Sequence, residues 1–191
     1  MLYKPARAII KVAAHIIYRF EVTGRHNIPT EGAFIFCANH IHSFDPAMVA
    51  IFTPRQPAFM AKKELFRNLF LNWLMTNLGA FPVDRKSADM KSYKKAMEIL
   101  NSGEGILIFS QGTRMKEFEN SKSGVAVFAL KSGAKIVPIG IRGSYRPFTK
   151  IHINIGTPIL MDKYKGQKVK TELVDEVMEK VVDSITRLCV G

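Results

Sequence analysis

The stretch GAFIFCANHIHSFDPAMVA, residues 32–50, decides the fold class of this chain. Residues 33–37 are a short apolar run between a glycine turn and a polar loop, which predicts a buried β-strand. Asp45 followed by Pro46 is typical of a helix start, with Asp45 as the N-cap and the proline at the first helical position. A buried strand that leads through a short loop into a helix is a unit of an α/β protein.

Apolar runs and helical patterns alternate along the rest of the chain. Short apolar runs predict strands at residues 57–61, 106–109, 136–141 and 152–155, with a connector or strand at 79–83. Helical spacing of apolar residues predicts helices at residues 64–78, 87–100, 125–131 and 171–188. We therefore expect an α/β fold with a mostly parallel central sheet flanked by helices.

Two helices leave alternatives open. Residues 1–20 contain no acidic residue and carry an apolar stripe beside a basic one: Ala6, Ile9, Ile10, Ala13, Ile17 and Phe20, and Lys4, Arg7, Lys11 and His15. This pattern predicts an N-terminal amphipathic helix, residues 1–20, on a membrane surface, or a helix packed on the domain of residues 21–191 with its lysines in water. The helix at 64–78 is apolar nearly all round, which predicts burial on the sheet, a second membrane-facing surface or one wall of an acyl-chain groove.

The composition limits the partners and the location of the protein. The 28 Lys and Arg residues exceed the 16 Asp and Glu residues and give a net charge of +12, which favours an anionic partner. The two cysteines exclude a disulfide framework. Lys4, Arg7, Lys11 and Arg19 interrupt the longest apolar candidate, so we expect no transmembrane helix. We expect a cytoplasmic protein that binds to the membrane surface.

The residues from Asn39 to Asp45 carry the most informative chemistry. His40 follows a predicted strand, and open α/β sheets place their sites at the carboxyl ends of strands. The five-residue spacing from His40 to Asp45 can bring the carboxylate onto one ring nitrogen and leave the other free to take a proton. These two residues therefore predict a general-base dyad. The alternative is that Asp45 only caps its helix and that His40 is an ordinary loop histidine.

The same stretch does not fit a metal site. Asp45 comes three residues after His42, and Pro46 stands where the His-x-His-x-Asp-His pattern of metal-dependent hydrolases has a histidine. No carboxylate cluster accompanies the remaining histidines, which are His15, His26 and His152. We expect no catalytic metal.

Three further blocks follow in a fixed order. They are GAFPVDR at residues 79–85, FSQGTR at 109–114 and VPIGI at 137–141. Together with residues 39–45 they resemble the four signature blocks of the glycerolipid acyltransferases, and the nearest branch is that of the 1-acylglycerol-3-phosphate (lysophosphatidate) acyltransferases. The segment AKKELF at 61–66 matches a stretch common in that branch. The resemblance runs from about residue 20 to about residue 160, so residues 21–191 are expected to be an acyltransferase domain.

The resemblance implies a reaction and a role for the His-x-x-x-x-Asp motif. His40 would take the proton of the acceptor hydroxyl, and Asp45 would orient the ring. The sn-2 hydroxyl of lysophosphatidate would attack an acyl thioester of acyl-carrier protein or coenzyme A directly and give phosphatidate for phospholipid synthesis. No acyl-enzyme and no cofactor beyond the acyl donor are expected. A membrane with anionic lipids is the expected surface, with the protein peripheral or monotopic on the cytoplasmic face.

The resemblance also implies which residues hold the acceptor. Arg114 would bind its phosphate, with backbone donors from the loop around Gly112 and Thr113. Lys62 and Arg85 match further family positions, although each could be a solvated surface cation. Gln111 stands where the family usually has a glutamate that helps to hold the glycerol. An uncharged side chain there leaves the chemistry intact and opens the choice of acceptor.

Other functions fit the sequence less well. The acceptor could be glycerol-3-phosphate or another lysolipid. A non-catalytic lipid-binding module would explain the N-terminal helix but not the His40–Asp45 block. Nucleic acid is not an expected partner, because no binding module is recognisable and the aromatic residues lie in apolar runs rather than between lysines.

Overall fold

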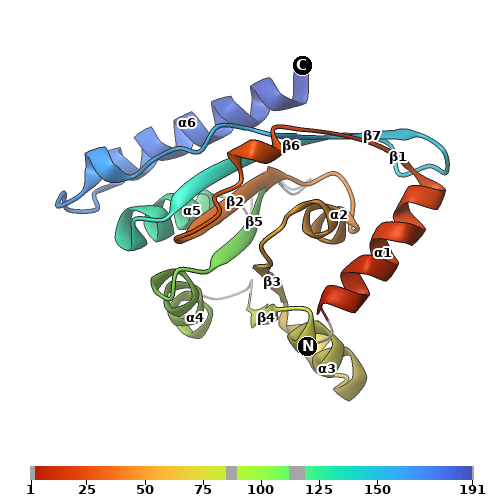
Figure 1. Ribbon diagram of the computed structural model, residues 1–191. Helices are drawn as coiled ribbons and strands as arrows, with labels where there is room; N and C mark the ends of the chain where they lie inside the picture. Colours follow the sequence, from red (N-terminus) through yellow and green to blue (C-terminus); the bar gives the residue numbers. More distant parts are fainter. Residues whose placement is uncertain (1–2, 85–89, 112–118, 191) are drawn as a thin grey trace.

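The computed structural model describes residues 3–84, 90–111 and 119–190. Within them, seven strands form one sheet in the order β1-β7-β6-β2-β5-β3-β4 (Figure 1). The strands are β1 (Arg19–Thr23), β2 (Phe34–Asn39), β3 (Pro57–Lys62), β4 (Ala80–Val83), β5 (Gly105–Gln111), β6 (Lys135–Gly143) and β7 (Lys150–Ile155). All neighbours pair in parallel except β6 and β7, which pair antiparallel. The predicted mostly parallel α/β fold is confirmed.

Helices cover both faces of this sheet (Figure 1). They are α1 (Tyr3–Ile17), α2 (Asp45–Phe52), α3 (Leu69–Asn77), α4 (Met90–Asn101), α5 (Glu119–Ser132) and α6 (Thr171–Val190), with short 3-10 turns η1 (Arg25–Asn27), η2 (Lys63–Phe66) and η3 (Asp162–Tyr164). The central strand β2 is buried on both sides, as the apolar run predicts. Phe34 and Phe36 pack with α1 and α2, whereas Ile35 and Cys37 pack with α4, α5 and α6.

The N-terminal segment differs from the prediction at its end. Helix α1 ends at Ile17, and Arg19 and Phe20 already belong to β1. The Arg19 amide donates to the carbonyl of Thr149, and β1 then pairs with β7. Every second residue of β1 is exposed, so this edge strand has no continuous apolar run for sequence reasoning to detect.

Helix α1 packs on the domain with one face and exposes an apolar face on its other side. Ala14 is buried, and the Arg7 guanidinium donates to the carbonyl of Ile51 at 3.3 Å, at the end of α2. Ile9, Val12 and Ile16 are 69%, 63% and 70% exposed. The predicted stripe is therefore wrong in detail, because Ile9 lies outside while Ile10 packs inward.

The predicted helix at 64–78 is two elements. The turn η2 ends at Phe66, and α3 begins at Leu69 with Asn68 as its N-cap. The Asn68 Oδ1 accepts from the amides of Phe70 and Leu71, which ends one element and starts the next. No residue of α3 is buried, so burial of this helix on the sheet is excluded for the chain on its own.

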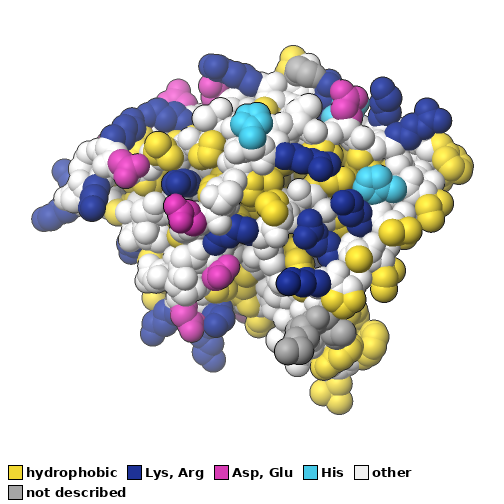
Figure 2. Space-filling model, viewed as in Figure 1, with side chains coloured by type: hydrophobic (Ala, Val, Ile, Leu, Met, Phe, Trp, Pro, Cys, Tyr) yellow, Lys and Arg dark blue, Asp and Glu magenta, His cyan; other side chains and the backbone are white. Residues whose placement is uncertain are grey.

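Apolar side chains gather on one side of the molecule. Figure 2 shows them over α3 and along the outer side of α1, with Lys and Arg side chains nearby. The most exposed members on α3 are Leu69, Phe70 and Trp73, at 86%, 65% and 53%. None of the helices in the described parts of the chain is long and apolar enough to cross a bilayer.

Candidate active site

The site begins where β2 ends. Asn39 is buried, and its side-chain amide makes two hydrogen bonds of 2.7 Å with the backbone N–H and C=O of Ile141 on β6. These bonds fix the last residue of β2 against the neighbouring strand. The chain then leaves the sheet at His40 and turns through residues 41–44 into α2. His40 therefore lies at the carboxyl end of a central parallel strand, as the sequence analysis predicts.

His40 and Asp45 form the predicted pair. The His40 Nδ1 lies 2.8 Å from the Asp45 Oδ2. An ionised carboxylate only accepts hydrogen bonds, so Nδ1 carries the hydrogen and Nε2 is the nitrogen that can take a proton. The His40 side chain is 34% exposed and Asp45 is fully buried. A substrate can thus reach the ring while the carboxylate stays out of water.

Asp45 does not cap its helix, which corrects the sequence prediction. It is the first residue of α2, and its side chain turns back toward the preceding loop. Besides His40, its Oδ2 accepts from the amides of Ile41 and His42 at 2.7 and 2.8 Å. These donors offset the cost of burying a charge, and the nearby N-terminus of α2 favours a negative group as well. The reading of Asp45 as only a helix cap is therefore wrong.

Two aromatic residues of the site were not predicted. The Tyr145 hydroxyl, in the connection between β6 and β7, donates to the Asp45 Oδ1 at 2.5 Å. Burial, followed by the hydrogen bond to Asp45 and the charge of that carboxylate, raises the pKa of Tyr145. The Phe109 ring lies 4.5 Å from the His40 ring between centroids. Tyr145 has no sequence signal, because only the pairing of distant strands brings it to the dyad. Phe109 is the first residue of the FSQGTR block, but the resemblance implies no role for it.

The predicted acceptor-binding residues are described only in part. Lys62 is exposed at the end of β3, while its neighbour Lys63 pairs with Asp84. Gln111 is the last residue of β5, and its backbone is the register partner of Asn39. β5 thus ends beside the residue that precedes His40. Lying outside the described residues are Gly112, Thr113, Arg114 and Arg85.

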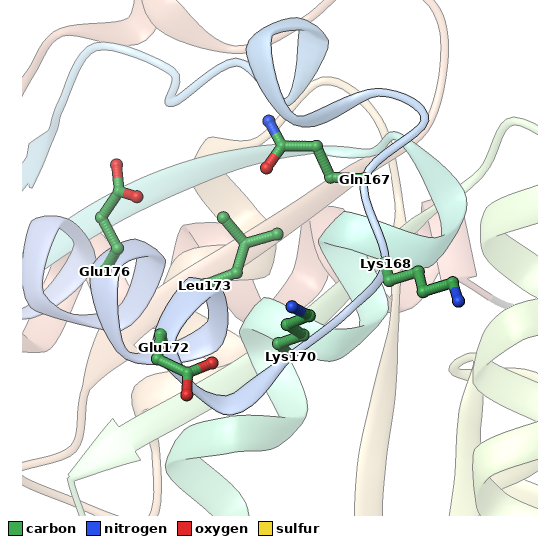
Figure 3. A pocket seen from close by; sticks show the side chains of 6 residues that line it. All are labelled: Gln167, Lys168, Lys170, Glu172, Leu173 and Glu176. Atoms are coloured by element: carbon green, nitrogen blue, oxygen red, sulfur yellow. The ribbon is translucent and has the colours of Figure 1, made fainter.

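In the part of the chain that the structure describes, no three His, Cys, Asp or Glu side chains gather as they would to hold a metal ion. An open hollow lies at the start of α6, lined by Gln167, Lys168, Lys170, Glu172, Leu173 and Glu176 (Figure 3). This hollow contains neither His40 nor Asp45. It lies at the N-terminal end of α6, whereas Leu188, near the C-terminal end of α6, packs against Gly140 on β6.

Comparison with known proteins identifies the family. The acyltransferase family model matches residues 19–142, which include His40 and Asp45. A 1-acyl-sn-glycerol-3-phosphate acyltransferase of Bacillus subtilis (strain 168) is 31% identical over 143 residues, covering 74% of this chain and 72% of the relative. The protein of the same name from Borreliella burgdorferi is 28% identical over 193 residues, covering 92% and 77%. This chain belongs to the acyltransferase family.

A solved structure supports the same conclusion. The crystal structure of the 1-acyl-sn-glycerophosphate (LPA) acyltransferase PlsC from Thermotoga maritima superposes with a TM-score of 0.73 at 27% sequence identity. The match covers 98% of this chain and 79% of that one. The similarity thus includes α1 and α6 as well as the residues that the family model matches.

Proposed function

We propose that this protein transfers an acyl group from an acyl thioester to the sn-2 hydroxyl of lysophosphatidate and so forms phosphatidate. The observation that carries the proposal is the His40–Asp45 pair, with a partly exposed ring on a buried carboxylate at the end of β2. The names of the relatives, which are 1-acyl-sn-glycerol-3-phosphate acyltransferases, support the choice of acceptor.

The geometry supports direct transfer from the donor to the acceptor, without an acyl-enzyme. The His40 Nε2 takes the proton of the acceptor hydroxyl as the oxygen attacks the thioester carbonyl. The C–O bond forms, the C–S bond breaks, and the departing thiolate takes the proton back from His40. Asp45 stabilises the imidazolium between these events. A positioned base contributes about 10²–10⁴-fold, so the alignment of two bound substrates supplies much of the remainder. The reaction as proposed uses no metal or cofactor besides the donor.

The acceptor phosphate would lie at the same edge of the sheet as His40. Gly112, Thr113 and Arg114 follow Gln111 in the sequence, and the backbone of Gln111 is the register partner of Asn39. Lys62 is the last residue of β3. This strand is parallel to β5, which lies between β3 and β2 in the sheet. Because Lys63 is already paired with Asp84, Lys62 is the better candidate of the two lysines for a phosphate contact. Arg85 comes two residues after β4 in the sequence and is a further candidate.

Replacing Arg114 with alanine is expected to raise the KM for lysophosphatidate about tenfold or more and to leave the KM for the acyl donor nearly unchanged. A guanidinium–phosphate contact is charge-assisted and often bidentate, so Arg114→Lys should recover only part of the loss. Steady-state kinetics with each substrate varied in turn provide the measurement. A lysophosphatidate KM equal to that of the parent enzyme would make Arg114 an ordinary surface cation.

A thiol-release assay tests the proposed function as a whole. The protein is given a long-chain acyl thioester with lysophosphatidate, glycerol-3-phosphate, another lysolipid or no acceptor. We expect release to require lysophosphatidate and phosphatidate to form in equal amount. Preference for another acceptor would contradict lysophosphatidate as the substrate. Absence of release with every acceptor would favour a lipid-binding module without activity. Comparing acyl-carrier protein with coenzyme A thioesters identifies the donor.

We also propose that α1 and α3 hold the protein on a membrane surface. Ile9, Val12 and Ile16 face outward on α1, and Lys4 and Lys11 are exposed beside them. Leu69, Phe70 and Trp73 offer a second apolar group on α3. A lysolipid acceptor resides in a bilayer, so an exposed apolar surface with flanking lysines suits a peripheral enzyme at the cytoplasmic face of the cell membrane.

The lysines should make membrane binding depend on anionic lipid. Each basic group near an anionic leaflet contributes about 1 kcal/mol, so K4E/K11E should weaken binding at least about tenfold. Arg7 is left unchanged because it bonds the end of α2. Sedimentation with anionic and neutral vesicles at two salt concentrations is the measurement. The matched control K168E/K170E, at the hollow in Figure 3, makes the same change in net charge on the opposite side of the molecule from α1.

The outcomes separate electrostatic from apolar binding. The proposal requires K4E/K11E to release the protein while the control stays bound. Equal release of both variants would mean that only net charge matters. Equal sedimentation of the parent with neutral and anionic vesicles would contradict the role of the lysines and assign binding to the apolar surface of α1 and α3.

A further inference from the structure

Tyr145 occupies the side of Asp45 that the His40 loop leaves open. The Oδ2 of Asp45 takes the hydrogen bonds of His40, Ile41 and His42, whereas its Oδ1 accepts from the Tyr145 hydroxyl. The Tyr145 hydroxyl comes from a segment 100 residues away in the sequence. The two oxygens of one buried carboxylate therefore have separate partners, one set from the loop after β2 and one from the connection after β6.

The backbone that presents Tyr145 is held in place. Gly143 has a φ of +123°, and a Cβ there would lie 2.4 Å from the carbonyl oxygen of Lys150, so the turn requires glycine. The Phe148 amide donates to the carbonyl of Ile17 at 2.6 Å, and the Thr149 hydroxyl donates to the carbonyl of Ser144. These bonds close the connection into a fixed loop and tie it to the end of α1.

The ring of Tyr145 is held as well. It stacks on the His42 ring with centroids 4.4 Å apart and planes inclined by 21°. The Tyr18 ring meets it edge-on at 5.7 Å. Both contacts use the aromatic faces and edges, so they persist when the hydroxyl is removed. The hydroxyl can thus be tested separately from the packing of the ring.

We propose that Tyr145 is a positioning residue for the acyl-transfer reaction: its hydroxyl fixes the rotation of the Asp45 carboxylate and thereby the orientation of His40. This inference rests on the proposed role of His40 as base. The terminal torsion of an aspartate is soft, so donors on one oxygen alone leave the carboxylate free to tilt. A donor on Oδ1 holds the plane and keeps Oδ2 on the His40 Nδ1.

The hydroxyl also shares the charge of the carboxylate. With Tyr145 donating, less negative charge on Asp45 faces the imidazolium, so His40 gives its proton back to the leaving thiolate more readily. Titratable groups in contact with the pair are His42, Tyr145 and, through Tyr145, Tyr18. Because the pKa of Tyr145 is raised, the hydroxyl remains a donor across the neutral pH range.

The test compares Tyr145→Phe with Tyr18→Phe. Each variant loses one hydroxyl and keeps its ring, and the contact of Tyr18 with Tyr145 is made by the ring. We expect Tyr145→Phe to lose about 10–100-fold in kcat with little change in the KM for lysophosphatidate, as the loss of an orienting partner typically does. The acid limb of its kcat/KM profile should move to higher pH, and so should the midpoint of the His40 ring titration followed by NMR. Tyr18→Phe should keep the parent values.

Two results would overturn this inference. One is a Tyr145→Phe enzyme with the kcat, acid limb and ring titration of the parent. The other is an equal loss in Tyr18→Phe, which would assign the effect to packing. The ring titration is read on folded protein, so a less stable variant still gives an answer. If His40→Ala retains activity, the base assignment fails instead, and that outcome is distinct from a failure at Tyr145.

Discussion

Replacing His40 with alanine should lower acyl transfer about 10²–10⁴-fold and leave the fold intact. The ring is 34% exposed, so its removal leaves no large cavity. Its bond to Asp45 is lost, but the carboxylate keeps the amides of Ile41 and His42 and the Tyr145 hydroxyl. Thiol release with a saturating acyl thioester and lysophosphatidate measures the activity, and circular dichroism and thermal melting report the fold.

The matched control for this variant is His42→Ala. His42 lies in the same loop and stacks on Tyr145, and its Nδ1 accepts from the Phe44 amide at 3.3 Å. It makes no side-chain contact with Asp45 comparable to that of His40, so its loss should be much milder. Activity of His40→Ala within a few-fold of the parent, or a larger defect in His42→Ala, would mean that another group takes the proton.

Replacing Asp45 with asparagine should have the second-largest effect, a loss of about 10²–10⁴-fold in kcat. In hydrolases with a related dyad such a change leaves the geometry intact and costs about 10⁴-fold, because an amide cannot stabilise the imidazolium and can favour the wrong tautomer. Asparagine is the informative substitution, because alanine would leave several buried donors without an acceptor and would destabilise the protein. Steady-state kinetics and a melting curve for Asp45→Asn give both readouts.

A double variant tests whether Asp45 acts through His40. If it does, His40→Ala/Asp45→Asn should be no slower than His40→Ala alone, because groups that act as a unit are not additive. Losses that multiply would show that Asp45 contributes by a second route, such as direct contact with substrate.

The sheet and the dyad could be predicted from the sequence for physical reasons. The central strand of this sheet is buried on both faces, and an uninterrupted apolar run of strand length, such as the one before His40, is typical of such a strand. The pairing of His40 with Asp45 follows from local geometry, because a loop of four residues closes easily when a helix starts at its end. Both conclusions depend on residues close together in the chain.

Contacts between distant segments could not be predicted in this way. Tyr145 follows β6, and it reaches Asp45 only because β6 pairs with β2 in a single register. The hydrogen bond from the Asn39 side chain to Ile141 continues that pairing toward the site. The break at Asn68 coincides with a polar pair, Arg67 and Asn68, and asparagine is a favoured N-cap residue. The apolar content of residues 64–78 nevertheless favoured one continuous helix. The exposure of Phe70 and Trp73 is one of the alternatives that the sequence left open, since an apolar helix must be covered by something and the sequence does not say by what.

The central claim is that His40 activates the acceptor for direct attack, without an acyl-enzyme. Rapid-quench mixing of a high concentration of enzyme with an acyl thioester, first without lysophosphatidate, tests it most directly. The account predicts no burst of free thiol and no acylated protein by mass spectrometry until the acceptor is added, and then release of thiol and phosphatidate at the same rate. A burst stoichiometric with enzyme in the absence of acceptor, with the acyl group bound to a side chain, would contradict the account.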